Sequence, residues 1–412
     1  MTTLLPPSPL EEPRPPPRRD GSLLVAVVAI VVSVALVGGI VLVVRDDGGQ
    51  ASAPGQEAPA RSSTTTAPPD DLAEAVRELS DFVAEERGRP FKAAVEVELL
   101  DDETFVDRLR ASEDEDEASI AESERLLRAV GLLDADDDLV EAVETASAEG
   151  VLGFYDPEDD ELVVRGSELS PGVLQTLVHE LTHAWDDQHF QLDRPALEEA
   201  DDESWFGFSA LVEGNAVRVE GAWEGTLSQE QRVQLRSDEG SATDRVLSAD
   251  VPQIVLQLLT LPYVTGSSLV DELLRAGGEE RVDAAFGAPP TTSEHVLDPT
   301  TYVDGAEPPV PVTEPAADGP VVDRGVYGAA GVLLTLIDHI PAEDARRAAE
   351  GWGGDRYVTW TTGDRTCVRM AFAGDDPEDV RELQSAWSAW AEDAPGADVR
   401  NDGGRVTVTS CG

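Results

Sequence analysis

The feature that most constrains this chain is the run His-Glu-Leu-Thr-His at residues 179–183, inside a segment with helical periodicity (173–190). Two histidines four positions apart lie on one helical face, about 5.4 Å apart along the axis. Both rings can therefore reach a single metal ion, and Glu180 between them can act on a water molecule instead of binding the ion. Apolar residues recur on the opposite side: Leu174, Leu177, Val178, Leu181 and Trp185. This pattern predicts a helix that packs through one face and presents His-Glu-His on the other.

A third ligand is needed, because zinc in hydrolases usually has three protein ligands and one open position. Glu213 lies in an otherwise small or apolar helical segment, where a carboxylate is costly without a counter-charge. His189 follows His183 by six residues, which is a second known ligand spacing, but Asp186 stands where that pattern has a turn-forming glycine. We expect His179, His183 and Glu213 to bind zinc, with His189 as the alternative third ligand.

The charge of the chain excludes one class of partner. It has 83 acidic and 30 basic residues, a formal net charge of −53. Phosphate backbones are repelled by such a field, so nucleic acid is not an expected partner.

A 23-residue uncharged apolar run at 22–44 predicts one membrane-spanning helix. Its length exceeds the apolar region of a cleaved signal peptide, which is about 7–15 residues. Arginines precede the run, so the positive-inside rule puts the N-terminus in the cytoplasm. The expected order is a disordered cytoplasmic tail (1–21), the transmembrane helix, a flexible linker (45–69) and an extracytoplasmic domain (70–412). The expected location is the cell membrane, with a single pass.

The two cysteines, Cys367 and Cys411, are expected to form a disulfide, since the chain around them is predicted to lie outside the membrane. Such a bond would join the last residues to an earlier strand. The surrounding segment, 356–412, reads as strand–helix–strand.

The expected fold class is α+β and mainly helical, with a small β-sheet packed on the His-Glu-His helix. Residues 151–166 read as a β-hairpin, and Leu162–Arg165 is predicted as a free edge that an extended peptide could join. Gly-Trp-Gly-Gly-Asp at 351–355 reads as a tight turn.

These motifs carry a resemblance to a known family. The stretch 176–190 together with Leu-Val-Glu-Gly-Asn-Ala (211–216) resembles gluzincin-type HExxH…E zinc metallopeptidases. More closely, the chain is similar to a poorly characterised group of bacterial membrane-anchored or secreted metallopeptidases. The further motifs shared with that group are Gly-Phe-Tyr-Asp (153–156), Thr-Ser-Glu-x-x-Leu-x-Pro-x-x-Tyr (292–302), Gly-Trp-Gly-Gly-Asp (351–355) and Ser-Cys (410–411). The resemblance covers about 70–412. One departure is Asn215, where such sequences often have Asp.

The resemblance implies a zincin-like catalytic domain that hydrolyses extracytoplasmic peptide bonds, with Glu180 as general base and then acid. An endopeptidase is expected, because no stretch typical of free-amine binding is present. Peptide hydrolysis also needs a donor to the developing oxyanion, and the sequence candidates are His295 and Tyr302, with Tyr327 behind them. The alternative hypothesis is a catalytically silent surface module that keeps this fold for binding or scaffolding. The substrate and the oligomeric state have no signal in the sequence.

Overall fold

A computed structural model describes residues 31–34 and 71–412, apart from 113–116, 199–201 and 364. The predicted tail, the linker and most of the predicted membrane span lie outside the described residues. Four residues inside that span, Val31–Val34, are described, and they form strand β1, paired with β3, instead of the predicted helix.

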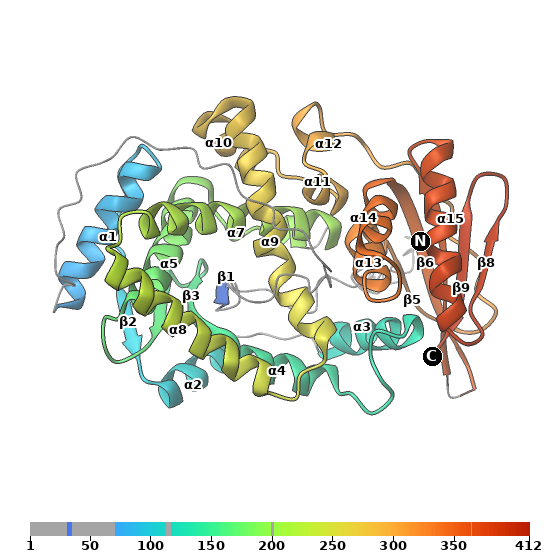
Figure 1. Cartoon of the computed structure of the whole chain (residues 1–412), viewed down its shortest axis with the longest axis horizontal. Coiled ribbons are helices and arrows are strands. Elements are labelled where there is room, and N and C mark those ends of the chain that lie inside the picture. The colour runs from blue at the N-terminus through green and yellow to red at the C-terminus, as the bar shows by residue number, and fades with distance from the viewer. Residues whose placement is uncertain (1–30, 35–70, 113–116, 199–201, 364) are drawn as a thin grey trace, which may run out of the picture.

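The first half of the domain combines a four-stranded sheet with long helices (Figure 1). The sheet order is β1-β3-β4-β2. Its remaining strands are β2 (Val97–Leu100), β3 (Val151–Asp156) and β4 (Glu161–Arg165). The helices are α1 (Leu72–Glu86), α2 (Asp102–Ser112), α3 (Glu117–Val130), α4 (Leu139–Gly150), α5 (Pro171–Phe190), α6 (Pro195–Glu198), α7 (Asp202–Glu224) and α8 (Gln229–Ser248).

The predicted hairpin is present as β3 and β4, but the predicted free edge at Leu162–Arg165 is wrong. Strand β4 lies between β3 and β2, because β2 adds to it in parallel. The strand that lies over helix α5 is β3, and its outer side pairs antiparallel with β1.

Helix α9 (Gln253–Gly277) runs through the centre of the molecule (Figure 1). Among the described residues it is the one helix long and apolar enough to span a membrane. However, 72% of its apolar window is buried inside the protein, which is typical of a core helix. Short helices follow it: α10 (Glu279–Gly287), α11 (Glu294–Leu297) and α12 (Thr300–Val303).

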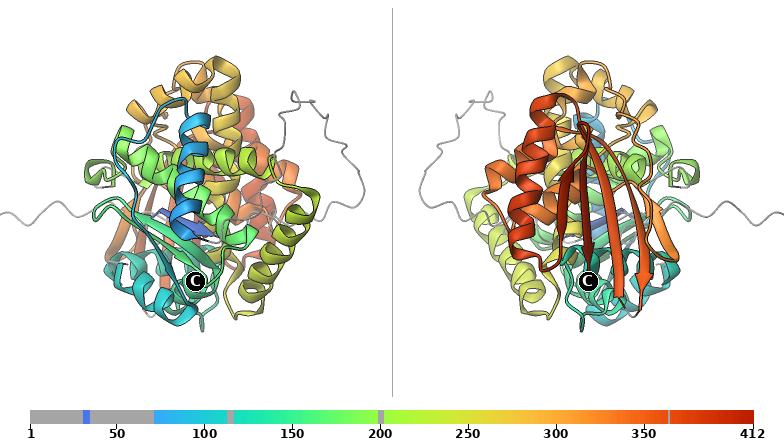
Figure 2. Two further views of the ribbon diagram at one scale, coloured as in Figure 1. Left: turned by 90° about the vertical axis from the view of Figure 1, so that its left-hand side faces the viewer. Right: turned by 90° about the vertical axis from the view of Figure 1, so that its right-hand side faces the viewer.

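The C-terminal part is a five-stranded antiparallel sheet covered by helices (Figure 2, right). The order is β5-β6-β7-β9-β8. Its elements are β5 (Val321–Gly325), α13 (Gly328–Leu336), α14 (Ala342–Glu350), β6 (Trp352–Thr362), β7 (Arg365–Gly374), α15 (Pro377–Asp393), β8 (Asp398–Asn401) and β9 (Val406–Cys411). One apolar core runs from α4, α7 and α9 into this sheet, so the two parts share an interior.

Two sequence predictions are resolved in this part. The disulfide between Cys367 and Cys411 is confirmed and joins directly paired residues of β7 and β9. Residues 351–355 are not an isolated turn, since strand β6 begins within them. Asp355 there accepts hydrogen bonds from the backbone nitrogens of Tyr327 (2.8 Å) and Gly328 (2.9 Å) and from Trp352 Nε1 (2.9 Å). The motif therefore holds the start of α13 against the sheet. The α+β, mainly helical fold class is also confirmed.

Candidate metal centre

Helix α5 begins where its sequence predicts. The Ser170 side chain accepts a hydrogen bond from the backbone nitrogen of Val173, and Pro171 occupies the first turn. The helix is more enclosed than its stripe pattern indicates, because every residue from Thr176 to Asp186 is buried. Helix α7 packs against it, and β3 lies across it. The polar face is thus covered by protein instead of being presented to water.

The predicted ligands come together in this interior. His179, His183 and Glu213 each offer one ligand atom, all within 4.8 Å of one another, and all three side chains are buried. Glu213 Oε2 lies 3.1 Å from His179 Nε2 and 3.5 Å from His183 Nε2. Helix α5 contributes the histidines and helix α7 contributes the glutamate. The three residues could therefore hold a metal ion.

The sequence alternative for the third ligand does not join this group. His189 stacks on Trp185 with ring centroids 3.9 Å apart. Its Nδ1 donates a hydrogen bond to the Trp185 carbonyl oxygen at 2.8 Å. The side chain is a partly exposed helix-end residue in this structure.

Glu220 orients His179 and was not predicted from the sequence. Its Oε2 accepts a hydrogen bond from His179 Nδ1 at 2.9 Å, which directs Nε2 toward Glu213. A carboxylate behind a metal-binding histidine fixes its tautomer and raises its basicity. Glu220 stands seven residues after Glu213, two turns along the same helix, so helical spacing could have found it.

The two histidines differ in the direction of their pKa shifts. Burial disfavours the imidazolium of His179, but hydrogen bonds and charge from Glu213 and Glu220 outweigh it and raise its pKa to about 10. Burial lowers the pKa of His183 to about 4, so this ring is neutral at pH 7. Neither ring nitrogen of His183 has a hydrogen-bond partner among the described residues.

The donor set fits a divalent ion by two observations. The buried, neutral His183 has unsatisfied ring nitrogens, of which Nε2 lies 3.5 Å from Glu213 Oε2, and a buried imidazole without a hydrogen-bond partner is costly. Although burial opposes it, the carboxylates of Glu213 and Glu220 raise the pKa of His179, so this position favours a positive charge beside Glu213. A metal ion supplies that charge and satisfies the ring nitrogen.

Glu180 lies under strand β3. Its side chain is fully buried. A Cβ built on Gly153 would come within 2.6 Å of Thr176 Cγ2 and 3.2 Å of Glu180 Cγ. Only glycine lets the strand approach this closely, which gives Gly-Phe-Tyr-Asp (153–156) a structural reason.

Tyr263 is a second residue that sequence reasoning missed. It comes from α9, and its ring stacks on His179 with centroids 6.0 Å apart. Its hydroxyl forms a side-chain hydrogen bond with Glu213, and burial together with the charges of Glu213 and Glu180 raises its pKa well above the usual value. Helices α7 and α9 bring it there, because they cross at Gly214 and Gly266, where an added Cβ would lie 2.1 Å or less from backbone oxygen.

The predicted oxyanion donors have other partners. His295 Nε2 donates to the Glu307 carbonyl oxygen (2.9 Å), and its Nδ1 accepts from the Thr291 backbone nitrogen (3.3 Å). The Tyr302 hydroxyl donates to the Ala288 carbonyl oxygen at 2.6 Å. Tyr327 is buried with its hydroxyl against Thr335. In the part of the chain that the structure describes, none of these side chains hydrogen-bonds the His-His-Glu group.

Comparisons with known proteins bear on the C-terminal part alone. A family model described as a domain of unknown function, DUF8575, matches residues 315–411. This range holds the five-stranded sheet and helices α13 to α15, but none of the candidate metal ligands. No curated protein and no solved structure matches the chain.

Proposed function

We propose that this chain is a zinc-dependent peptidase with a zincin-like, gluzincin-type catalytic domain. The observation that carries the proposal is the buried group of His179, His183 and Glu213, with Glu180 one helical position from the first ligand. Three protein ligands with a mixed nitrogen and oxygen donor set are typical of catalytic zinc sites.

The residues around the ion have separate roles in the proposed reaction. When bound, zinc would act as a Lewis acid that lowers the pKa of a water molecule and polarises a carbonyl group. Glu180 takes the proton of the attacking water and passes it to the leaving amine. Glu220 holds His179 in the tautomer that turns Nε2 to the ion.

Tyr263 replaces His295 and Tyr302 as our choice for the oxyanion donor. Its hydroxyl lies at the carboxylate of Glu213, and its high pKa keeps it protonated and able to donate at neutral pH. Both sequence candidates use their polar atoms on backbone groups of their own loop.

The proposed setting is outside the cytoplasm, on a membrane anchor formed by 22–44. This anchor requires Val31–Val34 to leave strand β3, which frees that edge for an extracytoplasmic protein or peptide substrate. The disulfide between β7 and β9 supports an oxidising compartment.

The test uses the full-length chain, purified in detergent, and a general protein substrate with and without chelator. Wild type is expected to hydrolyse the substrate and to lose this activity with the metal. Glu180→Gln is expected to keep zinc, measured by elemental analysis, and to lose hydrolysis by at least about 100-fold. Full hydrolysis by Glu180→Gln with zinc bound contradicts the proposal, and a zinc-loaded wild type without any hydrolysis favours the silent binding module.

A further inference from the structure

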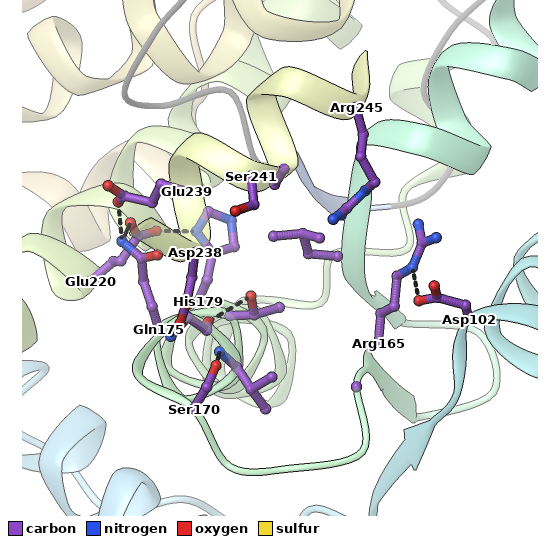
Figure 3. A pocket seen from close by; sticks show the side chains of 16 residues that line it. Asp102, Arg165, Ser170, Gln175, His179, Glu220, Asp238, Glu239, Ser241 and Arg245 are labelled. Carbon is purple, nitrogen blue, oxygen red and sulfur yellow. Dashed lines mark hydrogen bonds and ion pairs between the residues drawn. The ribbon is translucent and has the colours of Figure 1, made fainter. Parts of the chain in front are cut away.

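A cavity of about 290 Å³ opens beside the metal centre and is not explained by zinc binding (Figure 3). It lies between the first half of α5, helix α8 and the end of strand β4. His179 is on one wall, and Arg165 and Arg245 are on the opposite side. The volume is at the lower end of the range for small-ligand pockets.

The pairing of β1 on β3 indicates which part of a peptide would enter this cavity. A peptide that takes the place of β1 on this edge, in the same direction, runs from Tyr155 toward Val151 and passes Gly153 above Glu180. Its later residues therefore approach Leu152, which lines the cavity. For a peptide bound in this direction, the cavity receives residues on the C-terminal side of the scissile bond.

The wall near His179 is acidic. Gln175 Nε2 donates to Glu220 (2.8 Å), Glu224 (2.8 Å) and Glu239 (3.1 Å), which holds three carboxylates together. An anionic group of a substrate is repelled from this wall and is directed to the far end of the cavity.

The far end is basic and partly anchored. Arg165 donates from Nε to Asp102 (2.8 Å) and from Nη1 to the Ala148 carbonyl oxygen (2.7 Å), so its guanidinium is fixed. Arg245 extends from α8 into the cavity (Figure 3). The hydrogen bond from Arg165 lowers the pKa of Asp102, and the charges of both arginines add to this, but within the described ranges no hydrogen bond or ion pair joins the Arg245 guanidinium to another side chain. A guanidinium free to bind is suited to a carboxylate, which it can hold through two parallel hydrogen bonds.

We propose that this cavity is a substrate subsite in which Arg245, beside the anchored Arg165, recognises a carboxylate on the C-terminal side of the scissile bond. The inference rests on the proposed peptidase function. The carboxylate is either the free C-terminus of the substrate or an Asp or Glu side chain. The diffuse negative field of the protein does not prevent this contact, because salt screens exposed charges beyond about 8 Å at physiological ionic strength.

The first experiment measures cleavage by the full-length, zinc-loaded chain. Mass spectrometry of a digested peptide mixture identifies the best-cleaved peptide, which is then made as free acid and as amide, and with Glu or Gln at each of the two positions after the cleaved bond. In one of these pairs, the acidic peptide is expected to have a kcat/KM about tenfold or more above that of its neutral counterpart. The reason is that the neutral peptide cannot form the charge-assisted hydrogen bond with Arg245. The acid–amide pair reports a C-terminal carboxylate, and the Glu–Gln pairs report a side chain.

Variants assign the preference to the arginine. In Arg245→Gln, the ratio of kcat/KM between the acidic and the neutral peptide of that pair is expected to be close to one. Arg245→Lys is expected to leave an intermediate ratio, because lysine keeps the charge but loses the bidentate contact. The matched control is Arg236→Gln, which removes the same charge from another exposed position of the same helix, outside the cavity lining, and is expected to keep the wild-type ratio. Thermal unfolding of each variant checks the fold.

A binding measurement does not depend on turnover. Calorimetry compares acetylated tetra-alanine as acid and as amide, and acetylated Ala-Glu-Ala-Ala amide with its Gln counterpart. One acidic member is expected to bind about tenfold more tightly to wild type than to Arg245→Gln. Equal or undetectable binding of all four peptides overturns the inference, even if the chain hydrolyses peptides. Carboxylate-selective binding by a chain that cleaves no peptide preserves the subsite and overturns the proposed peptidase function.

Discussion

The metal centre and the Gly-Trp-Gly-Gly-Asp segment both bury polar side chains, but they treat their hydrogen-bonding groups differently. Asp355 is buried and receives three donors, from two backbone nitrogens and an indole. His183 is equally buried, and neither ring nitrogen has a hydrogen-bond partner among the described residues. A satisfied buried group contributes to stability, whereas an unsatisfied one is a cost that a ligand can repay. The first cluster therefore holds the fold together, and the second one is suited to an ion.

The largest expected effect is on metal affinity. Glu213→Ala removes one ligand, so zinc affinity is expected to fall by more than about 100-fold, beyond the range for outer partners. Glu220→Gln weakens only the orientation of His179 and is expected to cost about 10- to 100-fold. Competition with a chromophoric chelator measures both. His189→Ala is the control and is expected to retain zinc, while the reverse result would make His189 the third ligand.

Asp355→Ala is expected to act on stability instead. It leaves three buried donors without an acceptor, so the free energy of unfolding is expected to fall by about 3 kcal/mol or more. Asp355→Asn keeps one acceptor oxygen and is expected to lose less. Urea unfolding followed by tryptophan fluorescence measures both variants. A small loss for Asp355→Ala would show that this motif is not the structural counterpart of the metal centre.

The helix crossing that carries Glu213 and Tyr263 can be tested with alanine. An added Cβ at Gly266 would lie 1.9 Å from the Ala210 carbonyl oxygen. Gly266→Ala is expected to cost about 1–3 kcal/mol or more, because the helices must separate. Gly221→Ala, on α7 with nothing within 4 Å of the new Cβ, is the matched control and is expected to stabilise the protein by up to about 1 kcal/mol. Thermal unfolding compares the two, and equal melting temperatures would contradict the close crossing.

The smallest expected effect concerns a carboxyl pair that links the two parts of the molecule. Burial raises the pKa of Glu294 to about 9, helped by the charge of Asp375 and a hydrogen bond with it. A raised carboxyl pKa means that the folded protein binds the extra proton. Its contribution to stability is thus complete below about pH 4.5 and is lost as the pH rises through about 9.

Glu294→Gln places a side chain without charge at this position at every pH, so the loss of stability between about pH 4.5 and pH 9 is absent. Its stability relative to wild type is expected to increase by about 1–3 kcal/mol between pH 5 and pH 8, as measured by urea unfolding. The exposed Glu343→Gln on α14 serves as the control and is expected to show no such trend. A pH-independent difference for Glu294→Gln would show that the carboxyl is not held protonated.

Local periodicity was enough to predict the metal helix and much of the secondary structure. Helix α5 and the hairpin of β3 and β4 lie close to their predicted bounds. Prediction was weaker where packing decides the outcome. Helix α9 continues through Pro262, a residue type that usually ends or kinks a helix. Burial on nearly all sides outweighs the hydrogen bond that the proline removes.

The chemistry of the ligands follows from the sequence alone. The spacing of His179 and His183 and the isolated charge of Glu213 are local properties, and a helix converts spacing into a shared face. Which helices meet around these residues depends on the tertiary packing. Tyr263 reaches Glu213 because α7 and α9 cross closely at Gly214 and Gly266, which are 52 residues apart in the chain. Arg245 faces His179 across a cavity. Such contacts leave no periodic signal, because they depend on close packing between helices and not on the pattern within one.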